Sequence, residues 1–363
     1  MTATAKVVKC LVWDLDNTLW KGTLVEDGDV VLDEQIRDLI AELDRRGILQ
    51  SVASKNDHDN AWAKLEALGV ADYFVLPRIS WNPKSAAVAE IAAELNFALD
   101  VIAFVDDQPT ERAEVQFHHP EVRCYAAEQL GEIAARPEFR PATVTADAGN
   151  RRKMYQAGFR RKAAEAEFRG PSEDFLRTLG MVMRIDRATE ADLSRVEELT
   201  LRTSQMNATG VHYHRAELTA LVDDPDHEVL VTSLSDRFGP HGAVGLVLMA
   251  KHARVWHIRL LATSCRVVAF GVGSTLLNWL ADEGARTGVH LLADFLPTTR
   301  NRMMDVAYRF AGFTDDHCDC RTEPKPAELP DLRRLHLIPS PTDPPATLTL
   351  HAVSLTGAPA GRS

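Results

Sequence analysis

The sequence predicts an α/β fold in two parts: a parallel sheet with helices on both faces, and then a second α/β domain. Apolar, strand-like runs alternate with helix-like segments from Val7 to Tyr125, which is the βαβ pattern of a parallel sheet. Each of the first four runs stops at a cluster of polar or charged residues. A length of 363 residues is more typical of two domains than of one.

The first four apolar runs predict buried strands because they are short and bounded by polar residues. They span 7–13, 48–53, 74–79 and 101–105, with helix-like segments at 34–46, 60–68 and 85–95 and a last strand at 122–125. The gaps between them are too short for an inserted cap, since a domain needs about 50 residues or more. We therefore expect a Rossmann-like sheet without a large cap, whose only candidate flap is the segment 21–29.

Polar side chains follow the predicted strands at the point where each strand ends. They are Asp14 and Asp16, Ser54, Lys84, and Asp106 and Asp107. Because the carboxyl ends of parallel strands meet at one edge of a sheet, we expect these side chains to share a site. Two nearby Asp residues at a strand end are by themselves more typical of turn chemistry. The ordered set instead indicates a site where carboxylates bind a divalent cation and one of them attacks a phosphorus atom.

These residues resemble, in the same order, the four motifs of the haloacid dehalogenase (HAD) superfamily of phosphatases: Asp14-x-Asp16-x-Thr18, Ser54, Lys84 and Asp106-Asp107. The resemblance implies that Asp14 is the nucleophile and that Asp16 is the general acid and base. It also implies that Thr18, Ser54 and Lys84 bind the phosphoryl substrate, with Lys84 neutralising its charge.

The same resemblance implies a Mg²⁺ cofactor, because a cation is needed to bring a carboxylate and a phosphoryl group together. Its expected ligands are Asp14, the main-chain carbonyl of Asp16, and the pair Asp106 and Asp107. The sequence leaves open which of the pair binds directly, although Asp106 is our first choice because it ends the strand.

Four segments are expected along the chain: a HAD-like phosphatase domain, a helical connector, a GNAT-like acyltransferase domain and a Pro-rich, largely flexible tail. Their expected ranges are 1–145, 146–180, 181–330 and 331–363, with an edge strand in the tail near Leu348. The third segment resembles the GNAT fold because a strand leads into 264–273, a Gly-rich turn that we expect to open a helix reaching Ala285. Val268 stands where that family has a basic residue for the pyrophosphate of acyl-CoA, so CoA binding departs from the family pattern.

HAD motifs joined to a GNAT-like half resemble the FkbH family of polyketide biosynthesis. The resemblance is carried by 13–20, 104–112 and 264–267, with weaker support from 201–210 and 297–301. It implies that 1,3-bisphosphoglycerate is dephosphorylated and that its glyceryl group passes through a thioester on Cys265 to the phosphopantetheine thiol of an acyl carrier protein. Asn207 and Arg266 are the expected substrate-binding residues of this half. Cys265 also precedes a predicted helix, which favours a reactive thiolate, although a small core residue is the other reading.

Composition limits the partners. The formal net charge of −11 argues against a nucleic-acid partner. No stretch is long and apolar enough to span a membrane. We therefore expect a cytoplasmic protein with reduced thiols. Cys318 and Cys320, next to His317, would suggest zinc only with a second ligand pair, which the sequence does not show.

Two other functions stay open. One is a plain Mg²⁺-dependent phosphatase with a non-catalytic docking domain. The other is an acyl-CoA acyltransferase with a degenerate phosphatase half, which is less well supported because the phosphatase motifs are intact.

Overall fold

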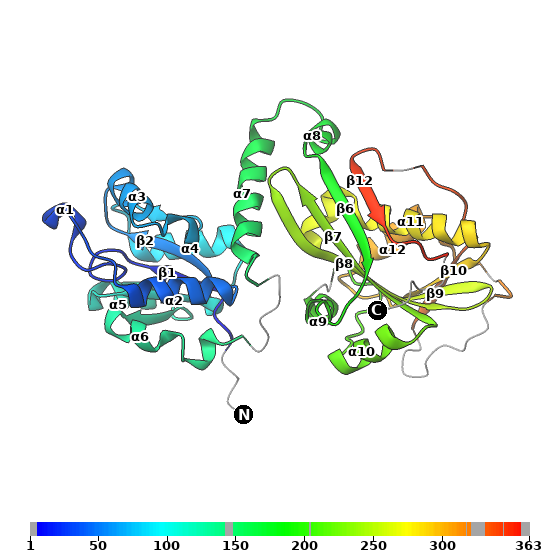
Figure 1. Cartoon of the computed structure of the whole chain (residues 1–363), viewed down its shortest axis with the longest axis horizontal. Helices are drawn as coiled ribbons and strands as arrows, with labels where there is room; N and C mark the ends of the chain where they lie inside the picture. The colour runs from blue at the N-terminus through cyan, green and yellow to red at the C-terminus, as the bar shows by residue number, and fades with distance from the viewer. Residues whose placement is uncertain are drawn as a thin grey trace. The chain divides into compact units, whose positions relative to one another are not determined.

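A computed structural model describes residues 6–141, 148–202, 205–316, 318–320, 331–343 and 345–356 (Figure 1). Thr203, Ser204 and His317, which the sequence analysis includes, lie outside these ranges. The chain divides into two compact units, residues 1–159 and 160–363, and the division falls inside the helix α7 (Arg151–Glu167). No described helix has the length and apolar composition needed to cross a membrane.

The first unit holds a five-stranded sheet in the order β3-β2-β1-β4-β5, in which every neighbouring pair is parallel. The strands are β1 (Cys10–Trp13), β2 (Leu49–Ser54), β3 (Arg78–Ile79), β4 (Ile102–Asp106) and β5 (Arg123–Ala126). The predicted strand at 74–79 is reduced to two residues, with Phe74 making only an isolated bridge to Gln50. The chain runs outward from β1 in both directions, so a crevice is expected at the carboxyl end of β1.

Helices cover both faces of this sheet, because successive side chains of β1 point to opposite faces and all of them are apolar and buried. Leu11 and Trp13 pack with residues of α2 (Glu34–Arg45) and α3 (His58–Ala67). Cys10 and Val12 pack with residues of α4 (Lys84–Leu95) and α5 (Pro109–His118). Both faces of β1 are therefore buried, which explains its continuous apolar sequence.

Only a short flap separates β1 from α2. It contains the four-residue helix α1 (Leu24–Asp27) and is closed by antiparallel pairing of Lys21 with Val31. A further short helix, α6 (Leu130–Ile133), packs on the α2 side. The described residues between β1 and α2 contain no cap domain, as expected from the length of this gap.

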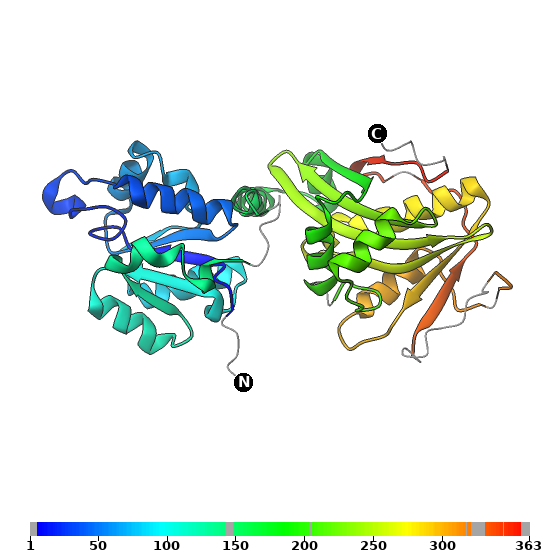
Figure 2. The same cartoon turned by 60° about the horizontal axis from the view of Figure 1, so that its bottom comes forward.

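The second unit holds a seven-stranded mixed sheet in the order β11-β10-β9-β8-β7-β6-β12 (Figure 2). Its strands are β6 (Met181–Arg187), β7 (His227–Asp236), β8 (Gly239–Lys251), β9 (Val255–Thr263), β10 (His290–Phe295), β11 (Arg333–Leu337) and β12 (Leu348–Ala352). Strands β6 to β9 are antiparallel, whereas β9 and β10 are parallel and are joined through α11 (Val272–Thr287). The mixed α/β class predicted for both halves is therefore observed.

Two helix layers enclose the second sheet. Val247 and Met249 share a core with α11, α12 (Arg302–Phe310) and α8 (Ser172–Thr178), whereas Leu246 and Leu248 pack with α9 (Leu193–Arg202) and α10 (Arg215–Asp223). Residues 333–337, which we assigned to the flexible tail, instead form the edge strand β11. The expected strand near Leu348 is present as β12, the other edge of the sheet.

Candidate active site

The strand ends of the first unit bring the predicted phosphatase residues together. Asp14 directly follows β1, Ser54 ends β2 and Asp106 ends β4, and β1 lies between the other two strands. Trp13 is in register with Val52 and with Val105, so the three polar residues lie at the same edge. All three side chains are buried.

Lys84 supplies the positive charge of this group. It is the first residue of α4, and its Nζ lies 2.7 Å from Asp14 Oδ1 and 2.6 Å from Asp106 Oδ2. The lysine side chain is only 4% exposed, so both ion pairs are shielded from water. A buried ammonium between two carboxylates is stable only because its charge is compensated on both sides.

Burial raises the pKa of Asp14 from 3.8 to about 6, and the nearby Asp106 carboxylate also raises it. Lys84 and the hydroxyl of Ser54 act in the opposite direction by stabilising the charged carboxylate. Burial also raises the pKa of Asp106, against the effect of Lys84. The site therefore holds more negative charge than Lys84 alone can balance, which favours a bound cation.

The carboxylates fit a magnesium ion. One oxygen each from Asp14, Asp106 and Asp107 lie within 4.8 Å of one another. Both oxygens of Asp106 already accept hydrogen bonds, from Lys84 Nζ and from the Gln108 amide at 2.8 Å. Asp107 Oδ1 is buried and has no hydrogen-bond partner among the described residues. An orphaned carboxylate oxygen favours Asp107 as a direct ligand, while our first choice of Asp106, which belongs to the same group, stays a prediction.

The side chain of Asp16 is hydrogen-bonded by residues of the flap region and by Asn56, and not by the group of Asp14, Asp106 and Lys84. Its Oδ1 accepts from Trp20 Nε1 at 2.8 Å and from the Leu24 amide at 3.0 Å, and its Oδ2 accepts from Asn56 Nδ2 at 3.0 Å. The side chain of Asp16 is not part of the acidic group around Asp14, so only its main-chain carbonyl stays a candidate ligand. Sequence reasoning missed Trp20 and Asn56, although Asn56 follows Ser54 in the polar cluster after β2.

Thr18 fixes the loop after β1. Its Oγ1 accepts a hydrogen bond from the Asp107 amide at 2.9 Å and lies 3.5 Å from Asp14 Oδ2. Asn17 has a φ of 53°, a left-handed conformation that Asn tolerates better than most residues and that turns the chain back toward the site. Thr18 thus orients both the Asp14 and the Asp107 segments. It also borders a cavity of about 260 Å³ lined by Asn17, Lys21 and Glu128 among others.

In the second unit, Cys265 and Arg266 follow the end of β9. The α-helix that we expected to open there begins further along the chain. Cys265 begins a 3₁₀ segment, Cys265–Phe270, whose first turn is capped by the Ser264 hydroxyl. Gly271, with a φ of 72°, ends this segment, and α11 starts only at Val272. Cys265 is exposed, as is Arg266, whose Nε lies 3.3 Å from Ser264 Oγ. A 3₁₀ segment has poorer hydrogen-bond geometry than an α-helix, so its dipole gives a thiolate less support than we expected.

Asn207 is a loop-fixing residue in this structure. It is buried, its Oδ1 accepts from the amides of Thr209 and Gly210, and its Nδ2 donates to the Thr200 carbonyl. The buried Asn301 donates to the carbonyl of Asn207 at 3.1 Å and to that of Leu296 at 2.9 Å. Because its amide is used by the backbone, Asn207 is poorly placed for the direct substrate contact that we expected.

Comparisons with known proteins give partial similarities. Neither a scan against protein-family models nor a search of curated proteins finds a match. Among solved structures, the chain is similar to the N-terminal part of protein BF1531 from Bacteroides fragilis, which contains a phosphatase domain complexed with Mg, at 30% identity and a TM-score of 0.33. That similarity covers 35% of this chain and 38% of the Bacteroides chain.

The other similarities are to acetyltransferases. Spermidine N-acetyltransferase from Vibrio cholerae matches at 15% identity and a TM-score of 0.32, covering 43% of this chain and 94% of its own. The GNAT domain of S. lividans PAT matches at 16% identity and a TM-score of 0.32, covering 42% and 88%. Each similarity spans less than half of this chain.

Proposed function

We propose that the first unit is a Mg²⁺-dependent phosphatase site in which Asp14 is the nucleophile. The observation that carries this proposal is the buried group of Asp14, Lys84 and Asp106, joined by Asp107 with its unpartnered Oδ1. A bound Mg²⁺ would be held by Asp14, Asp107 and the Asp16 carbonyl, and would neutralise charge between carboxylate and phosphoryl oxygens.

The residues of this site then have different roles in the reaction. A carboxylate oxygen of Asp14 forms a bond to phosphorus as the bond to the leaving oxygen breaks, and Asp16 gives that oxygen its proton. Lys84 and Ser54 stabilise the charge on the phosphoryl oxygens. Asp16 next takes a proton from water, whose oxygen attacks phosphorus, and inorganic phosphate leaves Asp14. In this role the Trp20 and Leu24 donors orient the Asp16 carboxylate from the flap side, and Asn56 orients it from the loop after β2.

For the whole chain we propose glyceryl transfer from 1,3-bisphosphoglycerate to the phosphopantetheine thiol of an acyl carrier protein. The thiolate of Cys265 attacks the acyl carbonyl, the bond to the acyl phosphate breaks, and inorganic phosphate leaves. The Asp14 site removes the second phosphoryl group by hydrolysis. Thiol exchange then moves the glyceryl group from Cys265 to the carrier with little change in free energy. Exposure of Cys265 supports this proposal because the carrier thiol must reach it.

We propose an acidic carrier protein as the acceptor of the glyceryl group. Arg266, Arg300 and Arg302 are exposed, and they offer positive charge to an acidic carrier despite the net charge of −11. Val268 in place of a basic residue gives no support for the pyrophosphate of free CoA. The alternative function, a plain phosphatase with a non-catalytic docking domain, is favoured by the 3₁₀ segment at Cys265, which gives the thiolate little help.

Intact-protein mass spectrometry tests these proposals together. Wild-type protein given 1,3-bisphosphoglycerate without acceptor should gain a hydroxylamine-labile adduct of glyceryl or phosphoglyceryl mass on the Cys265 peptide. Cys265→Ala should lose the adduct and still hydrolyse a generic phosphate ester, whereas Asp14→Asn should lose that hydrolysis. Cys124→Ala, at a half-buried cysteine of the first unit, is the matched control. Loading of the carrier by Cys265→Ala at near the wild-type rate would overturn the thioester on Cys265, and the glyceryl group would then pass directly from the acyl phosphate to the carrier thiol.

A further inference from the structure

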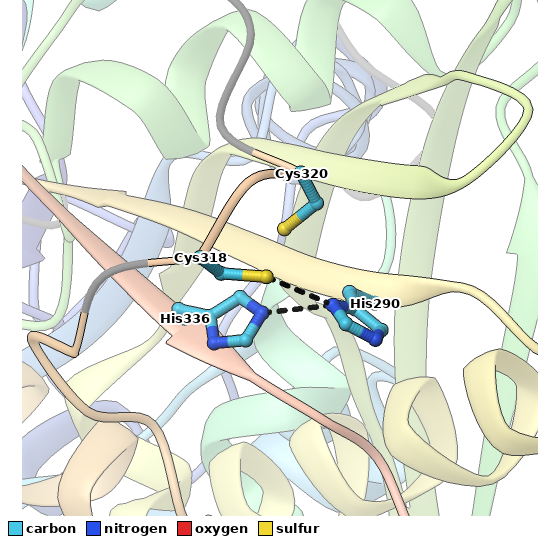
Figure 3. Close-up of side chains that lie close together, drawn as sticks. All are labelled: His290, Cys318, Cys320 and His336. Atoms are coloured by element: carbon cyan, nitrogen blue, oxygen red, sulfur yellow. Dashed lines mark hydrogen bonds between the residues drawn. The ribbon is translucent and has the colours of Figure 1, made fainter.

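Four side chains of the second unit that the proposed function does not use lie close together. They are His290, Cys318, Cys320 and His336, and one nitrogen or sulfur atom from each lies within 4.8 Å of those of the others. Figure 3 shows the four side chains converging from β10, from β11 and from the loop that carries both cysteines. We propose that this Cys₂His₂ group binds one structural zinc ion.

The two histidines are positioned by strand register. Strands β10 and β11 are antiparallel, with Leu292 opposite His336. His290 is two residues from Leu292, so it lies on the same face of the sheet and is a diagonal neighbour of His336. The two rings are 5.0 Å apart between centroids, and His336 Nε2 lies 3.0 Å from His290 Nδ1. This half of the group is therefore fixed by the sheet itself.

The two cysteines reach the same face from the loop that follows Thr314. Thr314 pairs with His336 as an isolated antiparallel bridge, which holds the start of this loop beside β11. Cys318 Sγ lies 3.4 Å from His290 Nδ1. Cys320 is buried and packs with Val255 and Leu292, and Cys318 packs against the same cluster. The group thus has an apolar floor, which limits access of water to a bound metal.

Hydrogen bonding explains this arrangement poorly. His290 Nδ1 faces both His336 Nε2 and Cys318 Sγ, yet a ring nitrogen of neutral histidine has either one proton or one lone pair to share. Zinc bonds of about 2.0–2.1 Å to nitrogen and about 2.3 Å to sulfur place tetrahedral ligand atoms about 3.3–3.8 Å apart. The separations of 3.0 and 3.4 Å need only small shifts to match.

The ligand types indicate the metal and its role. Two nitrogen and two sulfur ligands in a tetrahedron are typical of zinc. Four protein ligands leave no open position for water or substrate, which indicates a structural site rather than a catalytic one. Binding converts two thiols to thiolates and releases two protons, so the two new negative charges balance the charge of Zn²⁺. The ion would tie the cysteine loop to the edge of the sheet formed by β10 and β11.

Metal analysis of the full-length protein tests this site. Protein purified from zinc-supplemented medium should contain about one zinc ion per chain, and Cys318→Ser/Cys320→Ser less than about one tenth of that. Chelator-treated wild-type protein titrated with Co²⁺ should develop thiolate-to-cobalt charge transfer and the intense visible bands of tetrahedral Co²⁺. Zinc should displace these bands and raise the midpoint of thermal unfolding.

Two controls separate this site from other metal-binding groups. His212→Ala/His214→Ala removes another group, which these residues form with Glu197, and should leave zinc content and the cobalt bands unchanged. Cys124→Ser controls for the loss of a cysteine elsewhere.

Alkylation needs no variant and covers the case in which the double substitution fails to fold. Zinc should protect the Cys318 and Cys320 peptides of wild-type protein from iodoacetamide, and a chelator should expose them. Equal labelling of these peptides with and without zinc, or zinc retained by a folded Cys318→Ser/Cys320→Ser protein, would overturn the proposal.

Discussion

Replacing Lys84 by Met tests the electrostatic core of the candidate phosphatase site. Methionine keeps an apolar stem of similar length but removes the ammonium that lies 2.7 Å from Asp14 and 2.6 Å from Asp106. Because this charge is buried and aimed at Asp14, the proposed nucleophile, we expect phosphate release from a generic phosphate ester to fall about 10²–10³-fold, or about 2.7–4 kcal/mol of transition-state stabilisation.

The same substitution should destabilise the first unit in the absence of metal. Leaving buried charge without its partner costs about 3–5 kcal/mol. The pKa of Asp14 is already raised to about 6 by burial although Lys84 lowers it, and without Lys84 it should rise further. A carboxyl with a raised folded pKa lowers stability above its unfolded pKa; this loss begins to shrink as the pH falls through the folded pKa and is gone below the unfolded pKa. The deficit of Lys84→Met should therefore be largest at neutral pH, smaller below about pH 6, and smaller when Mg²⁺ is added.

Hydrogen exchange of the β1 and β4 peptides measures this deficit within the first unit, and a phosphate-release assay measures the rate. Lys6→Met is the control, since Lys6 pairs with Asp100 at the surface and its loss should cost less than about 1 kcal/mol. Phosphate release by Lys84→Met within about threefold of wild type would refute the electrostatic role of Lys84. A stability deficit that is the same at every pH and Mg²⁺ concentration would refute the charge argument.

Three further perturbations test individual contacts. Asp107→Asn should raise the Mg²⁺ concentration for half-maximal phosphate release by more than about tenfold, measured by metal titration, and an unchanged requirement would return Asp106 to the direct-ligand role. Asp236→Asn should destabilise the second unit by about 3–5 kcal/mol in urea at pH 7, because the buried carboxylate pairs with Arg161 at 2.5 Å and His241 at 3.0 Å. Although burial acts to raise the pKa of Asp236, its hydrogen bonds from His241 and Arg161 hold this pKa below 3.8. The wild type should therefore stay more stable to unfolding than Asp236→Asn at pH 5, and this difference should decline only below about pH 4. Asn301→Ala should cost about 1–3 kcal/mol by leaving buried carbonyls of Asn207 and Leu296 unpaired, and equal urea midpoints for variant and wild type would contradict this role.

The sequence by itself determined the strands of the first unit and the residues at their ends, except that β3 is much shorter than predicted. Buried parallel strands carry a local signature, a short apolar run, and polar groups must follow where each strand leaves the core. Asp14, Ser54 and Asp106 were therefore identifiable without coordinates, and the absence of a cap followed from the short gap between β1 and α2.

Only the tertiary structure decided which partners these residues have. The hydrogen bonds that occupy Asp106, and the flap contacts from Trp20 to Asp16, depend on side-chain directions that a linear pattern does not contain. The same holds for Cys265, where the sequence could not separate a 3₁₀ segment from the first turn of α11.

The Cys₂His₂ group shows most clearly what a sequence pattern cannot predict. Cys318 and Cys320 are visible as a pair, but His290 and His336 join them only because β10 and β11 are antiparallel and in a register that places both rings on one face. Pairing of strands far apart in the sequence is set by packing of the whole sheet, so no local pattern reports it.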